Sequence, residues 1–81
     1  MKKTRSPKIQ SRIPLLRMTY IRRAILRRVP FTAAEMAEQL ETHPRTIERD
    51  IEFMRNWLGY EIQFDFKLNS YVGRVPAITT L

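Results

Sequence analysis

Apolar residues recur at helical spacing in the segment that follows Pro14. Intervals of three and four residues place them on one face of a helix, and the arginines of the segment are expected largely on other faces. This helix is predicted to end near Arg28, because Pro30 disfavours helical geometry in the residue before it. The predicted apolar face holds Leu15, Met18, Ile21 or Arg22, Ile25 and Val29, and the arginines expected elsewhere are Arg17, Arg23, Arg27 and Arg28.

Two shorter helices are predicted next. Thr32 and Glu35 have the spacing of a capping box, which starts the second helix. Pro44 suits the first position of the third helix, with Thr42 or His43 as its cap, because proline has no amide to leave unsatisfied there. The inward faces are predicted to hold Met36, Ala37 and Leu40 in the second helix, and Ile47, Ile51, Met54 and Leu58 in the third, flanked by Phe53 and Trp57. Two short helices joined by a tight turn are typical of a helix-turn-helix.

The hydrophobic period changes to two after Gly59, which supplies a left-handed helix stop. Residues 60–66 alternate apolar and polar side chains and predict a strand, residues 67–70 a turn in which Asn69 tolerates positive φ, and residues 71–73 a returning strand. An isolated hairpin is marginal in water, so it is expected to pack Ile62, Phe64, Phe66 or Tyr71 against the helices. The predicted class is therefore α+β, mostly α, with three helices and a C-terminal β-hairpin wing.

Charge divides the chain sharply. Residues 1–28 hold ten Lys or Arg and no acidic residue, whereas residues 29–81 hold five basic and eight acidic residues, so +10 and −3 make the net charge of +7. A polycation beside a folded unit is a usual footprint of phosphate-backbone binding, although a basic tail that only confers solubility has the same composition. We interpret residues 1–12 as a flexible basic arm, 13–74 as the folded domain and 75–81 as a linker or tail.

Several classes of function are disfavoured by the same sequence. There is no cysteine for disulfides or thiolate metal sites, which fits a cytoplasmic protein, and no apolar run approaches the ~20 residues of a membrane span. No nucleophile–base pair, metal-ligand spacing or phosphate-cradling glycine loop is present. The chain is thus predicted not to be an enzyme and to need no cofactor or metal.

The segment TAAEMAEQLETHPRTIERDI, residues 32–51, resembles the helix-turn-helix of DeoR-type and WYL-type bacterial transcriptional regulators. The positions that match are Met36, Ala37, Leu40, Arg45, Thr46, Ile47, Arg49, Asp50 and Ile51. With its flanks the resemblance covers roughly residues 15–75, and the ending is similar to the run that leads into an effector-sensing WYL domain. It implies regulation of transcription through double-stranded DNA, with an effector domain missing from this chain. A departure is Glu41, which stands where such motifs place Gly.

A recognition helix presents its N-terminal part to the major groove, which points to Arg45, Thr46 and Arg49 as base or phosphate contacts. Either arginine can pair in a bidentate way with guanine. Asp50 is instead predicted to be a structural partner for a nearby arginine, because its charge would repel phosphate. The full predicted DNA-binding set is Thr32, His43, Pro44, Arg45, Thr46, Arg49 and Lys67, the last at the wing tip.

A single small module offers few base contacts, so a homodimer on a palindromic site is predicted. Two alternatives stay open at this point. One is a winged-helix module that binds protein, and the other is RNA binding, which the basic arm favours.

Overall fold

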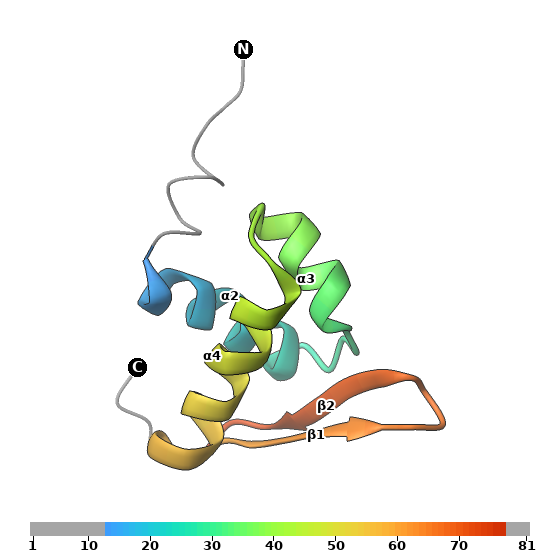
Figure 1. Cartoon of the computed structure of the whole chain (residues 1–81). Helices are drawn as coiled ribbons and strands as arrows, with labels where there is room; N and C mark the ends of the chain where they lie inside the picture. The colour runs from blue at the N-terminus through green and yellow to red at the C-terminus, as the bar shows by residue number, and fades with distance from the viewer. Residues whose placement is uncertain (1–12, 78–81) are drawn as a thin grey trace.

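The computed structural model describes residues 13–77. The helices are α2 (Pro14–Leu26), α3 (Ala33–Leu40) and α4 (Pro44–Trp57), and the strands β1 (Glu61–Asp65) and β2 (Ser70–Arg74) form an antiparallel hairpin (Figure 1). The predicted class, three helices followed by a hairpin wing, is confirmed. The arm predicted for residues 1–12 lies outside the described residues. No helix within residues 13–77 has the length and apolar character needed to cross a membrane.

The core lies where the three helices meet. Its fully buried side chains are Ile21 from α2, Leu40 from α3, and Ile47, Ile51 and Met54 from α4. Ala37 is also buried, and its small side chain allows α3 and α4 to pack closely. The inward faces predicted for α3 and α4 are confirmed, except that Leu58 is only half-buried.

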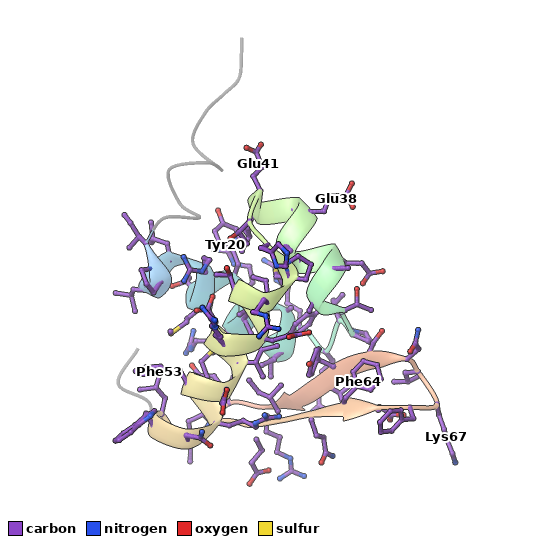
Figure 2. All side chains as sticks on the ribbon, viewed as in Figure 1. Tyr20, Glu38, Glu41, Phe53, Phe64 and Lys67 are labelled. Atoms are coloured by element: carbon purple, nitrogen blue, oxygen red, sulfur yellow. The ribbon has the colours of Figure 1, made fainter. Side chains whose placement is uncertain are left out.

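Leu15 and Val29, predicted on the apolar face of the first helix, are exposed, and so are Phe53 and Trp57, which were predicted to flank that of the third. Leu15 and Val29 are 55% and 54% exposed, and Phe53 and Trp57 are 44% and 76% exposed. Leu15 lies in the first turn of α2 and Val29 beyond its end, where the other helices do not cover them. Phe53 and Trp57 flank the buried stripe of α4 without belonging to it, and Figure 2 shows Phe53 at the side of that helix.

Helices α2 and α3 each end in a tight left-handed turn that is closed by local backbone hydrogen bonds. Arg28 has φ 57°, and the amides of Arg28 and Val29 donate to the carbonyls of Ile25 and Ala24. Glu41 has φ 55° and repeats this arrangement at the end of α3, where the Thr42 amide donates to the Ala37 carbonyl. Both are Schellman motifs, which satisfy carbonyls that a helix end leaves without partners.

The hairpin is fixed to the helices by a short third pairing. Phe31, between α2 and α3, forms a bridge with Tyr71 of β2, with N···O distances of 3.4 and 2.6 Å. Ile62 is buried, and Phe64 and Tyr71 are half-buried, as predicted for residues that pack inward. Phe66 is 86% exposed and does not pack on the helices. Asn69 takes the predicted positive φ in the connecting turn.

Candidate nucleic-acid interface

Helix α4 buries one face and leaves the other open. Ile47, Asp50 and Ile51 are buried, whereas Arg45, Glu48, Arg49 and Glu52 are exposed and Thr46 is half-buried. Side chains four residues apart share a helix face, so Arg45 and Arg49 lie one turn apart on the open side. Among residues 13–77, neither guanidinium takes part in a hydrogen bond or an ion pair. Both are thus available to an acceptor from outside the protein.

The start of α4 is closed by its own cap. The His43 Nδ1 atom accepts from the Arg45 amide at 3.0 Å, and the His43 carbonyl accepts from the Thr46 amide at 2.9 Å. Pro44 has no amide to offer. The Arg45 and Thr46 amides are therefore not free to hold a phosphate, because His43 already accepts from both. What remains for an anion is the helix dipole and the Nε2–H of His43, which carries the ring proton because Nδ1 accepts.

The predicted DNA-binding residues do not form one cluster. His43, Pro44, Arg45, Thr46 and Arg49 lie together in the cap and first turns of α4. Thr32 lies at the other end of α3, where its hydroxyl accepts from the Glu35 amide at 3.0 Å and completes the predicted capping box. Lys67 lies at the far end of the hairpin, away from the helices (Figure 2).

A buried ion pair holds α4 against α2. Arg17 Nε donates to Asp50 Oδ2 at 2.6 Å, and Arg17 Nη2 donates to Asp50 Oδ1 at 3.1 Å. The predicted structural role of Asp50 is confirmed. Arg17 was expected largely away from the apolar face, but only 8% of it is exposed. The signal was present in the sequence, since Arg17 is four residues before Ile21 and so shares its face.

This pair matters for the electrostatics of the open face. Asp50 follows Arg49 directly, yet its carboxylate is turned inward and neutralised by Arg17. The acidic groups that share the open face are Glu48 and Glu52, both exposed. Arg45 and Arg49 therefore lie among carboxylates on this face. The carboxylates reduce the general electrostatic attraction of the face to the phosphate backbone more than they reduce a direct hydrogen bond from an arginine to a base.

The wing also carries a residue that sequence reasoning did not single out. Gly73 lies opposite Ile62, and a Cβ atom on it would come within 2.1 Å of the Glu61 carbonyl oxygen. A glycine inside a strand is the available signal for such a close backbone approach.

Three helices, a tight turn before an exposed α4 and a hairpin wing define a winged helix-turn-helix, a class of DNA-binding domain. A family model described as an HTH domain matches residues 17–67, and the chain belongs to this helix-turn-helix family. No curated protein matches significantly. The search of solved structures gives no significant match either.

Proposed function

We propose that this chain is the DNA-reading domain of a transcriptional regulator and that α4 enters the major groove of a specific site. The observation that carries the proposal is the pair Arg45 and Arg49, both exposed and without a hydrogen-bond or ion-pair partner in the described part of the chain, on a helix whose opposite face is packed into the core. A guanidinium fits the O6 and N7 acceptors of guanine with two parallel hydrogen bonds. A rigid helix makes such contacts selective, because a mismatched base leaves the arginine unpaired.

The other predicted residues complete this interface. Thr46 lies beside Arg45 and reaches a base or a phosphate, while His43 and Pro44 bring the helix cap close to the backbone. Thr32 and Lys67, at the start of α3 and at the wing tip, contact phosphates on either side of the groove that holds α4. These assignments rest on the exposure or part-exposure of each residue and on the usual docking of the class.

The finer assignment is to regulators of the DeoR and WYL types, on the strength of the Arg-Thr-Ile-x-Arg-Asp-Ile segment, residues 45–51. It includes the division into an arm at residues 1–12, a domain at 13–74 and a linker at 75–81, with an effector domain beyond it. A homodimer in the cytoplasm that binds a palindrome follows from the same assignment. Non-enzymatic action is part of this proposal.

The test selects bound duplexes from a random pool and then measures affinity for the winning site and for a scrambled duplex. Arg49→Ala is expected to lose ~1 to 3 kcal/mol on the selected site and little on the scrambled one. The matched control is Arg74→Ala, an exposed arginine at the end of β2, which should lower both affinities alike. Equal losses for the two variants on both duplexes would refute base reading by α4.

A protein-binding module is the second candidate, and one observation favours it. Leu15 and Phe53 line an open apolar groove of about 510 Å³ between α2 and α4. Such a module would bind all duplexes weakly, with affinity lost near physiological salt. The selection experiment separates the two, because only a DNA reader yields a preferred sequence.

A further inference from the structure

The tip of the wing presents an aromatic side chain to solvent. Phe66 is 86% exposed and Leu68 is 55% exposed, with the exposed Lys67 between them. Burial of a side chain the size of Phe stabilises a fold, and this protein forgoes most of that stabilisation at Phe66. A projecting apolar group beside a cation suits a partner that offers both an apolar cleft and negative charge.

Phe66 is not loose, because a chain of ring contacts links it to the core. Its ring meets Phe64 edge to face at 5.0 Å, Phe64 meets Tyr71 at 5.2 Å, and Tyr71 meets the buried Phe31 at 5.7 Å. The backbone bridge between Phe31 and Tyr71 fixes the inner end of this chain. The outer ring is thus braced against the helices through three aromatic contacts.

The turn itself is also held. Asp65 Oδ1 accepts from the Lys67 amide at 2.9 Å and from the Leu68 amide at 3.2 Å. These bonds hold the carboxylate of Asp65, the only acidic side chain close to the tip along the described hairpin, in the turn, whereas Lys67 carries the positive charge that projects from it. Figure 2 shows Lys67 projecting from the end of the hairpin.

We infer that Phe66 is a wedge that enters the minor groove of duplex DNA and partly unstacks one base step, with Lys67 on an adjacent phosphate. This inference rests on the proposed DNA-reading function and adds to it a deformation of the site. Insertion of an apolar side chain costs base stacking, and a ring that is already held in place inserts without the further cost of being ordered. Pyrimidine–purine steps unstack most easily and are the expected target.

The experiment uses the selected duplex with a fluorescent adenine analogue placed at its pyrimidine–purine steps. The full chain is expected to raise fluorescence at one step at least twofold and to bend end-labelled duplexes measured by energy transfer. Phe66→Ala should lose most of both signals while it still prefers the selected over the scrambled duplex. Phe66→Leu, which keeps an apolar wedge, should keep part of them.

Trp57→Ala is the matched control, because Trp57 is an exposed aromatic in the last turn of α4 rather than at the wing tip. It should leave both signals unchanged. Selective binding without any unstacking, or full unstacking by Phe66→Ala, would overturn the wedge but leave the DNA-reading function standing. The wedge is also overturned if Phe66→Ala alters self-association without DNA in sedimentation. If the selection from the random pool yields no preferred duplex, both the proposed function and the wedge are refuted.

Discussion

Within residues 13–77, three non-glycine residues adopt left-handed backbone conformations, and they are not equally suited to it. Asn69 tolerates positive φ well because its short polar side chain can bond locally, whereas at Arg28 and Glu41 the Cβ atom crowds the following carbonyl oxygen without such compensation. At both positions the turn is imposed by the bonds that close the preceding helix. The strain is therefore local and removable by glycine.

Glu41→Gly is expected to raise the free energy of unfolding by about 0.5 to 1 kcal/mol. The left-handed conformation costs a non-glycine residue roughly 1 to 2 kcal/mol, and the greater freedom of glycine in the unfolded chain returns part of this gain. Urea denaturation followed by circular dichroism measures the change. The control is Gln39→Gly, in the helical and exposed part of α3, which should lose about 1 kcal/mol. A Glu41→Gly protein less stable than the parent would contradict the argument.

Gly59 and Gly73 are required for different reasons, a positive φ at Gly59 and a close backbone contact at Gly73, and alanine substitutions test both. At Gly59 the backbone has φ 78° with open space around the missing Cβ, so Gly59→Ala should cost about 1 kcal/mol of conformational strain. At Gly73 a Cβ would collide with the Glu61 backbone, so Gly73→Ala must push β2 away from β1. Its expected cost is roughly 2 to 3 kcal/mol, by analogy with overpacked sites. Thermal unfolding of both variants checks the order, and a smaller loss at Gly73 would be the contrary result.

At the scale of elements, the register of α4 against α2 depends on a polar contact inside the fold. Asp50→Asn should destabilise the protein by about 3 to 5 kcal/mol, because it leaves the Arg17 guanidinium buried without its counter-charge. Arg17→Met likewise leaves the buried Asp50 carboxylate without its counter-charge. The double variant should lose much less than the sum of the two, and denaturant unfolding of all four proteins measures the coupling. Additive losses would show that the two residues act independently.

Elements with a strong local pattern were predictable from the sequence. The capping box at Thr32, the proline at the start of α4 and the positive φ of Asn69 all depend on neighbours within a few residues. Burial at the edges was not predictable in this way. Phe53 and Phe66 are apolar but stand at positions that the other described elements cover only in part, and this depends on how the helices and hairpin cross.

In the candidate site too, some features were predictable from the local sequence pattern and others were not. The open face of α4 followed from the period of its buried residues, since Ile47 and Ile51 fix which side is outward. The use of the Arg45 amide by His43 and the pairing of Arg17 with Asp50 did not follow from the period. The first depends on a side-chain rotamer and the second on contact between residues 33 positions apart.

At the scale of the whole molecule, the charge proposed to attract DNA and the face proposed to read it lie in different parts of the chain. Residues 1–12 hold five of the fifteen basic residues, whereas the described α4 alternates arginine and glutamate on its open face. Attraction to the phosphate backbone and selection of a sequence are therefore expected to be separable. Each neutralised phosphate releases counterions, so the change in salt dependence when residues 1–12 are removed is expected to report the phosphate contacts proposed for them.

Deletion of residues 1–12 is expected to weaken binding to the selected and the scrambled duplex by the same factor. Because five cations are removed, the slope of log affinity against log salt concentration should become shallower by up to about 4.5. Fluorescence anisotropy titrations over a range of salt concentrations measure both quantities. Deletion of residues 78–81, which carry no ionisable side chain, is the control and should leave the slope unchanged. An unaltered slope after the first deletion would show that the arm does not touch DNA, and a loss of selectivity would show that it reads bases.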